Sequence, residues 1–330
     1  MPGAALAFAW RTADGAAQAL RWSTAFARRP GWRREVVRTG LEVWTETGGP
    51  AVAEGPAPNA VWVGRCAGAN VPVVRDPERP SSTAQRVLRE TWGGYLLLLA
   101  DREGGWQVLR DPSGALEALT WRRGDLAVLA TALEPMPPWT WPSTLALDWA
   151  QVADVLRRPA SLTAATPLSG IHTVAPGDLQ PLGEAPQAAE ALWRPLSRAL
   201  APAPSIEVAR ETLSAAVDVA VTGMVAPHAR CMAEVSGGLD STIVSATLAS
   251  APGERQLSLA HVFVDLAEAD ERAWAMQAQA AVRAPIDILN KAIAPLTLED
   301  FTELARGARP ALNALDPGRD RLTRDLLVAR

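Results

Sequence analysis

The sequence predicts an α+β domain with stacked antiparallel sheets over residues 1–200, followed by an α/β domain with a parallel sheet over residues 201–330. Before residue 200, short aliphatic or aromatic runs are separated by Gly, Pro and Asp, which is typical of strands joined by tight turns. After residue 205, apolar runs alternate with helix-like stretches, as in parallel βα units. Twelve of the thirteen tryptophans precede residue 200, and the Ala-Pro-Ala-Pro run at 201–204 is typical of a linker.

The first domain is predicted to be rich in strands. They are expected at residues 4–10, 42–44, 61–65, 95–100, 106–110, 116–121 and 126–130. Two Asp- and Gly-containing turns, at 101–105 and 111–114, separate the middle strands, and the first of them favours a hairpin. Helices are predicted at 82–91 and 148–157.

The second domain is predicted to alternate helix and strand. Its order is a helix at 205–225 capped by Ser205, a strand at 230–235, a helix at 242–251, a strand at 257–265, a helix at 270–282 and a strand at 286–289. This alternation favours a parallel sheet with helices on both faces.

Composition excludes several classes of function. The net charge is −4, and the composition does not suggest the clustered basic surface that nucleic-acid binding needs, so no nucleic-acid partner is expected. Two cysteines, Cys66 and Cys231, make no disulfide framework, and the N-terminus lacks a basic region before its apolar run. We therefore predict a cytoplasmic protein with no membrane partner. Lys291 is the only lysine, and its place after a predicted strand favours a solvated side chain.

The strongest motif lies between a predicted strand and a predicted helix. It reads Ser236-Gly237-Gly238-Leu239-Asp240-Ser241. The glycines allow a sharp turn close to a ligand, and the unpaired amides at the start of a helix favour phosphate. Asp240 beside a polyphosphate suggests a Mg²⁺ ion between them, so ATP and Mg²⁺ are the expected ligands.

The loop lacks the Gly-Lys-Ser/Thr of a Walker A motif, so no lysine within it reaches the β- and γ-phosphates. A loop that holds pyrophosphate instead suits attack at the α-phosphorus. The expected products of that attack are an acyl-adenylate and pyrophosphate.

On these residues the chain resembles the PP-loop ATP pyrophosphatases, whose fold is adenine nucleotide alpha hydrolase-like. The run from Val235 to Thr242 is similar to the asparagine synthetase branch, although GMP, NAD and tRNA lysidine synthetases share variants of the loop. The resemblance implies that Phe263 and Val264, at the end of the second strand, contact adenine. Asp270-Glu271, followed by alanines, resembles the family's Asp-Glu-x-x-x-Ala helix and is also compatible with simple helix capping.

The N-terminal domain resembles the class II glutamine amidotransferase domain of the same synthetases, which has an N-terminal-nucleophile (Ntn) fold. The shared order is Trp-Gly-Gly-Tyr at 92–95, Arg-Asp-Pro-Ser-Gly at 110–114, a Pro-Gly turn at 176–177 and Trp-Arg-Pro at 193–195. In an active glutaminase of this class, a cysteine after the initiator methionine is the nucleophile. Here Pro2 occupies that position. We therefore expect this domain to be catalytically inactive, with no catalytic residue assigned.

An amide-forming enzyme without a glutaminase needs another amine. The residues of the Trp-Gly-Gly-Tyr and Arg-Asp-Pro-Ser-Gly motifs look most like those of lasso-peptide cyclases. This resemblance implies that an Asp or Glu side chain of a peptide is adenylated and that the N-terminal amine of the same peptide attacks it. The implied partners are a precursor peptide or small carboxylate substrate, and a leader-peptidase protein. The alternatives are an asparagine synthetase homologue that uses free ammonia, and a truncated nucleotide-binding pseudoenzyme. The last stays open because the family's second Gly-Gly-Asp loop does not occur before Arg330, so we expect a truncated product, a fragment or one half of a split enzyme.

Overall fold

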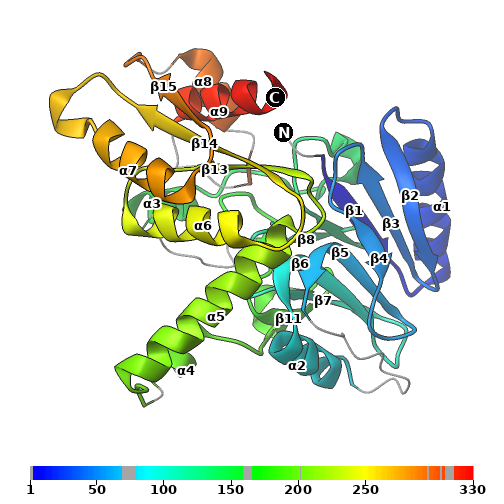
Figure 1. The fold of residues 1–330 in the computed structure, drawn as a ribbon. Coiled ribbons are helices and arrows are strands. Elements are labelled where there is room, and N and C mark those ends of the chain that lie inside the picture. The colour runs from blue at the N-terminus through cyan, green and yellow to red at the C-terminus, as the bar shows by residue number, and fades with distance from the viewer. Residues whose placement is uncertain are drawn as a thin grey trace. The chain divides into compact units, whose positions relative to one another are not determined.

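A computed structural model describes residues 3–68, 79–158, 166–200, 202–295, 297–304, 307–308 and 316–329. It has mixed α/β architecture, with two antiparallel sheets and one small parallel sheet (Figure 1). The chain forms two compact units. One comprises Met1–Ala201 with Glu303–Asn313, and the other comprises Pro202–Thr302 with Ala314–Arg330.

The first unit contains two six-stranded sheets. One has the order β10 (His172–Thr173), β8 (Leu119–Arg123), β9 (Leu126–Ala130), β1 (Ala5–Ala9), β3 (Leu41–Glu46), β2 (Trp32–Arg38). The other has the order β12 (Glu190–Ala191), β11 (Asp178–Pro181), β7 (Trp106–Arg110), β6 (Trp92–Ala100), β5 (Ala60–Ala67), β4 (Val52–Glu54). All their pairings are antiparallel, so the predicted stack of antiparallel sheets is confirmed.

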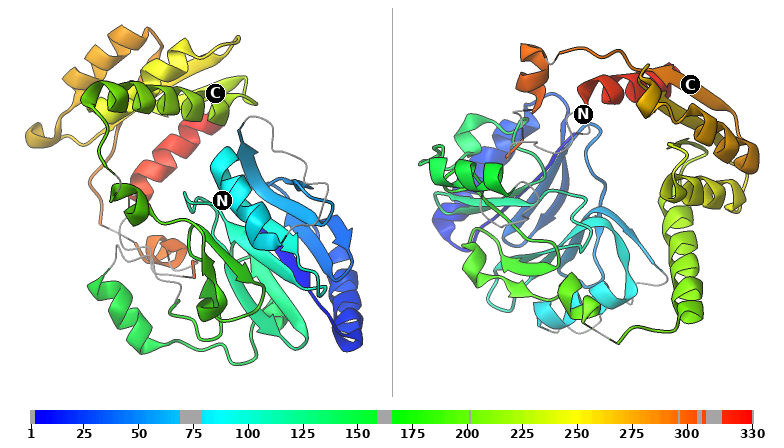
Figure 2. Two further views of the ribbon diagram at one scale, coloured as in Figure 1. Left: turned by 90° about the horizontal axis from the view of Figure 1, so that it is seen from below. Right: turned by 90° about the vertical axis from the view of Figure 1, so that its left-hand side faces the viewer.

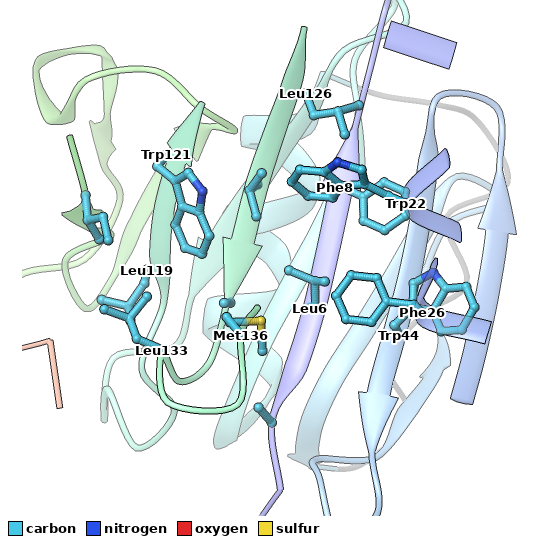
Figure 3. Close-up of a cluster of buried hydrophobic side chains, with 14 of the residues drawn as sticks. Leu6, Phe8, Trp22, Phe26, Trp44, Leu119, Trp121, Leu126, Leu133 and Met136 are labelled. Carbon is cyan, nitrogen blue, oxygen red and sulfur yellow. The ribbon is translucent and has the colours of Figure 1, made fainter. Parts of the chain in front are cut away.

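The side chains of β1 divide between two cores, because successive residues of a strand point to opposite faces. Leu6 and Phe8 pack with Trp22 and Phe26 of α1 (Ala13–Ala27) on the outer face of the first sheet (Figure 3). The small side chains of β1 turn the other way, into a core shared with β5, β6 and β7 of the second sheet.

The outer face of the second sheet forms a third core. There, Trp62 and Tyr95 pack with Ala84 and Val87 of α2 (Pro80–Glu90). The first unit is therefore layered as helix, sheet, sheet, helix. The remaining helices of this unit are α3 (Trp149–Arg157) and α4 (Pro195–Ala199).

Most predicted strands and turns of the first unit are found. The strands predicted at 106–110 and 126–130 match β7 and β9 residue for residue. The hairpin between β6 and β7 is closed by the Gly105 amide, which donates to Oδ1 of Asp101 at 2.7 Å. Helix α1 and strand β2 were not predicted.

The second unit is built on a parallel sheet with the order β13 (Arg230–Glu234), β14 (Gln256–Phe263), β15 (Ile286–Asn290). Helices α6 (Leu239–Ser250) and α7 (Arg272–Val282) connect these strands. Because the strands lie in chain order, right-handed crossovers place both helices on one face. Helix α9 (Pro317–Ala329) lies on the opposite face, and both further views show the same order of layers (Figure 2).

Helix α5 (Ile206–Val225) also belongs to the second unit, as do the residues of α8 (Leu298–Leu304) up to Thr302. The predicted cap of α5 is confirmed, since Oγ of Ser205 accepts a hydrogen bond from the Val208 amide at 3.3 Å. Helix α6 begins at Leu239 rather than at the predicted Thr242, and α7 begins at Arg272 rather than Asp270. In the described part of the chain, no helix is long and apolar enough to cross a membrane.

Candidate functional site

The candidate loop follows β13 directly. Val235 is fully buried, and its amide donates to the carbonyl oxygen of Ala260 on β14 at 2.8 Å. The chain then turns through residues 236–238 and enters α6 at Leu239. The carboxyl end of a parallel strand therefore faces the first turn of a helix, which is where α/β sheets place their ligands.

Gly237 is required by its surroundings. Its φ is +85°, in the left-handed region, and an added Cβ would lie 2.3 Å from Cβ of Trp274 and 2.8 Å from the Ala275 amide nitrogen. No side chain fits there, because the contacts are with the first turn of α7 rather than with a flexible side-chain end. The loop is thus held against the start of α7 as well as the start of α6.

Three hydroxyl groups close the loop on itself. Oγ of Ser236 lies 3.2 Å from Oγ of Ser241 and accepts a hydrogen bond from the Gly238 amide at 3.3 Å. The hydroxyls of Ser241 and Thr242 both donate to the Gly238 carbonyl, at 3.2 and 2.8 Å. These contacts are local and set the turn before any ligand arrives.

The first turn of α6 is open to solvent and carries no side-chain cap. Gly238 is the N-cap, and it has no Cβ from which a side chain could satisfy the first amides. Leu239 is 74% exposed, and its apolar side chain does not compete for those N–H groups. Unpaired amides and the positive end of the helix dipole make this a favourable position for an anion.

Asp240 lies in that same first turn and is exposed. In the described ranges, it has no ion pair, and no group of three or more His, Cys, Asp or Glu residues could hold a metal ion. A single carboxylate beside a phosphate site matches the way proteins bind Mg²⁺, with one or two carboxylates and the substrate phosphates. Asp240 therefore fits such an ion only together with a bound polyphosphate.

His261 on β14 contacts the residue that immediately precedes the loop. Its side chain is 2% exposed, and Nδ1 lies 2.7 Å from the carbonyl oxygen of Val235. Because a carbonyl oxygen only accepts, Nδ1 carries the hydrogen. Within the described residues, the buried Nε2 has no hydrogen-bond partner.

The two expected adenine contacts point in different directions. The Cζ atom of Arg272 lies over the ring of Phe263, 4.2 Å from the ring centroid. The Phe263 ring is also parallel to that of His261, with the two centroids 6.5 Å apart. Val264, the next residue, lines a cavity on the other side of the strand end. The structure thus brings the loop and Phe263 to the start of α7, and it separates Val264 from them.

Arg272 is held in place by Asp270. Its Nε and Nη2 atoms donate to the two carboxylate oxygens at 2.8 and 2.7 Å. Hydrogen bonds from the Arg272 side chain and amide lower the pKa of Asp270 to about 2. Arg272 follows the Asp-Glu pair directly, and this adjacency is the sequence signal that could have identified it.

The single lysine, which the sequence predicts to be solvated, is partly exposed and forms an ion pair. The Lys291 side chain is only 25% exposed and forms an ion pair with Asp316, at the start of α9. The local sequence does not indicate this ion pair, because residue 316 is far away in the sequence and comes close only through the tertiary fold.

The first unit offers no activated thiol in the described ranges. Cys66 is half-buried, and burial raises the pKa of its thiol. Pro2, at the position of the family's nucleophile, lies outside the described residues. Comparison with models of known protein families finds no match for this chain, and no curated protein matches it.

Proposed function

We propose that this protein binds ATP through residues 236–241 and activates a carboxylate as its adenylate in order to form an amide. The observation that carries the proposal is the loop itself. A glycine pressed against α7, a pair of serine hydroxyls and an uncapped helix start converge within one strand–loop–helix unit. This combination favours a bound polyphosphate.

In the proposed reaction, the amides of the first turn of α6 and the loop hydroxyls hold the β- and γ-phosphates. Asp240 orients the Mg²⁺ that accompanies them, which supplies charge neutralisation when bound. The substrate carboxylate attacks the α-phosphorus, the bond to the β-phosphate oxygen breaks, and pyrophosphate leaves. An amine then attacks the activated carbonyl, AMP leaves with the bonding electron pair, and the amine loses a proton.

The first unit supports the finer assignment. Its helix–sheet–sheet–helix layering and motif order are those expected of an Ntn-type amidotransferase domain, and the second unit has the strand and helix order expected of a PP-loop domain. With Pro2 in place of the nucleophile, we propose that the amine belongs to the substrate. A lasso-type macrolactam closure of a precursor peptide satisfies this requirement.

The test is ATP–pyrophosphate exchange with the full chain. Exchange that depends on a precursor peptide with an acidic side chain is expected, and it should disappear in Asp240→Ala. Exchange driven by free aspartate, with asparagine formed from ammonia, would favour the synthetase alternative. Binding of MgATP without any exchange would identify a nucleotide-binding protein that is not an enzyme. Absence of both would overturn the proposal.

A further inference from the structure

A second candidate site lies at the carboxyl ends of β14 and β15. It is a cavity of about 610 Å³, lined on the sheet side by Val264, Lys291 and Ile293, and on the α9 side by Asp316, Arg321 and Leu322. All of these residues belong to the second unit. The cavity therefore combines apolar surface with charges of both signs.

Lys291 connects this cavity to the end of β14, where the expected adenine contacts lie. Its amide donates to the carbonyl oxygen of Phe263 at 2.8 Å, so it lies beside the end of β14. It is also the one lysine in a chain with 32 basic residues. Its side chain is only 25% exposed, and a partly buried ammonium is more stable when it is paired.

Asp316 provides that pairing and also begins α9. One of its carboxylate oxygens contacts Lys291, and the other accepts from the Arg319 amide at 3.1 Å. Burial acts to raise the pKa of Asp316, but the hydrogen bonds from Lys291 and Arg319 outweigh it and lower the pKa below its ordinary value. The carboxylate therefore stays charged at neutral pH.

The other ion pair of the cavity, Arg321–Asp300, stabilises the start of α8. Asp300 is 3% exposed, and it accepts from the amide and hydroxyl of Thr297, both at 2.8 Å, while its amide donates back to that hydroxyl. This reciprocal pattern is a capping box at the start of α8. Arg321 pairs with the same carboxylate, which is 5% exposed. The side chains of Lys291 and Asp316 are 25% and 40% exposed, so theirs is the ion pair that a ligand could reach and separate.

The charge of the ligand follows from the ion pair that it replaces. Lys291 and Asp316 are partly shielded from water, with side chains 25% and 40% exposed. A simple anion that took Lys291 would leave Asp316 without its partner, and a simple cation that took Asp316 would do the same to Lys291. A molecule with both a carboxylate and an ammonium replaces one ion pair by two and leaves neither residue unpaired. The apolar side chains of Val264, Ile293 and Leu322 suit an aliphatic segment between the two charges.

We propose that this cavity binds a zwitterionic ligand, with its carboxylate on Lys291 and its ammonium on Asp316. The choice of ligand rests on the proposed function, since an intramolecular amide closure needs an amine and a carboxylate in one substrate. The location fits that role. Strands β13 and β15 flank β14, so their ends are separated by two strand spacings, roughly 10 Å. The cavity and the loop therefore lie at the same carboxyl edge of the sheet, the cavity on the α9 side and the loop at the start of α6.

The single lysine makes a direct test possible. The full chain is labelled with ¹³C and ¹⁵N lysine, which gives one lysine signal, from Lys291. Three probes of matched chain length are titrated: γ-aminobutyrate, butyrate and butylamine. A saturable shift of the Lys291 signal is expected with γ-aminobutyrate, at concentrations at least tenfold below those needed for the other two. No shift, or equal shifts from all three probes, would overturn the proposal.

Matched variants separate binding from folding. Asp316→Asn keeps the lysine reporter and should weaken the γ-aminobutyrate response at least tenfold, whereas Asp320→Asn, an exposed acid in the same helix turn, should leave it unchanged. If Asp316→Asn loses helical signal in circular dichroism, Lys291→Met/Asp316→Asn removes both charges together and is tested by calorimetry, where loss of the binding heat is expected. Retained binding in either variant would contradict the assignment.

ATP binding is measured on the same samples. A selective zwitterion response without ATP binding would disprove the proposed function and leave the cavity assignment intact. ATP–pyrophosphate exchange with no zwitterion response would disprove the cavity assignment alone.

Discussion

Nδ1 of His261 donates to the carbonyl oxygen of Val235, 2.7 Å away, and so joins β14 to the residue immediately before the phosphate loop. The contact is buried, and water cannot replace it without a cavity to occupy. It fixes the direction of the Val235–Ser236 peptide, from which the loop turns. Three contacts therefore hold the loop. They are the hydrogen bond from His261 to Val235, the packing of Gly237 against Trp274, and the hydrogen bonds from the hydroxyls of Ser241 and Thr242 to the Gly238 carbonyl.

Replacing His261 tests whether its hydrogen bond to Val235 holds the loop. In His261→Leu, the Val235 carbonyl loses its side-chain donor, and we expect the second unit to lose about 1–3 kcal/mol of stability, the usual cost of an unsatisfied buried polar group. Amide exchange of residues 236–241 should accelerate, as measured by hydrogen–deuterium exchange. The control is His172→Leu, in β10 of the first unit, which should change neither the stability of the second unit nor the exchange of residues 236–241. Equal exchange in both variants would show that His261 does not hold the loop.

The two loop glycines should differ. Gly237→Ala places a Cβ against the backbone of α7 at a positive φ, and we expect a loss of roughly 2–5 kcal/mol together with loss of ATP binding. Gly238 has a φ of −70°, and its added Cβ would meet only Oγ of Ser236, at 3.3 Å. Gly238→Ala should therefore cost under about 1 kcal/mol. Urea unfolding and calorimetric titration with MgATP measure both effects, and equal losses would contradict the assignment.

Replacing Asp240 should weaken the binding of MgATP without strongly destabilising the fold. Asp240→Asn removes an exposed carboxylate, so the free energy of unfolding should fall by no more than about 1 kcal/mol, the value of a favourable charge near a helix start. The affinity for MgATP should fall by about tenfold or more. Glu207→Gln is the matched control, because Glu207 is an exposed acid in the first turn of α5. It should leave MgATP affinity unchanged, and an equal loss would argue for a general effect of net charge.

The elements predicted from the sequence are those whose local pattern agrees with their tertiary role. Strands β7 and β9 are short aliphatic runs between turn residues, so they were predicted residue for residue. Strand β2 lies at a sheet edge, and four of its seven residues are charged, so it has little apolar pattern. In α1, alanines dilute the helical period, and only Trp22 and Phe26 are large buried anchors.

The site was predictable only where it is local. The loop, Gly237 and Asp240 follow from one strand–loop–helix pattern. The contact of Gly237 with Trp274 and that of Lys291 with Asp316 join segments distant in the sequence, and no local pattern encodes them. The opposite directions of Phe263 and Val264 follow from strand alternation, which a motif that names consecutive residues does not express.

The only tyrosine of the chain, Tyr95, gives a prediction for the first unit. Tyr95 is fully buried between Trp62 and α2, and burial raises the pKa of its phenol far above its usual range, only partly offset by a hydrogen bond with Thr91. A group whose pKa is raised on folding contributes stability that is complete below its unfolded pKa and is lost as the pH rises. We expect no tyrosinate absorbance from the folded protein at pH ~10, where an unfolded chain is half ionised.

Above that pH, ionisation of Tyr95 should appear together with unfolding of the first unit, followed by circular dichroism. In urea, the same phenol should titrate near pH ~10. Tyr95→Phe keeps the ring against Trp62 and has no ionisable group, so the first unit should resist alkaline pH better than the unmodified chain does. A phenol that titrates near its ordinary value in the folded protein would contradict the packing of β6 under α2.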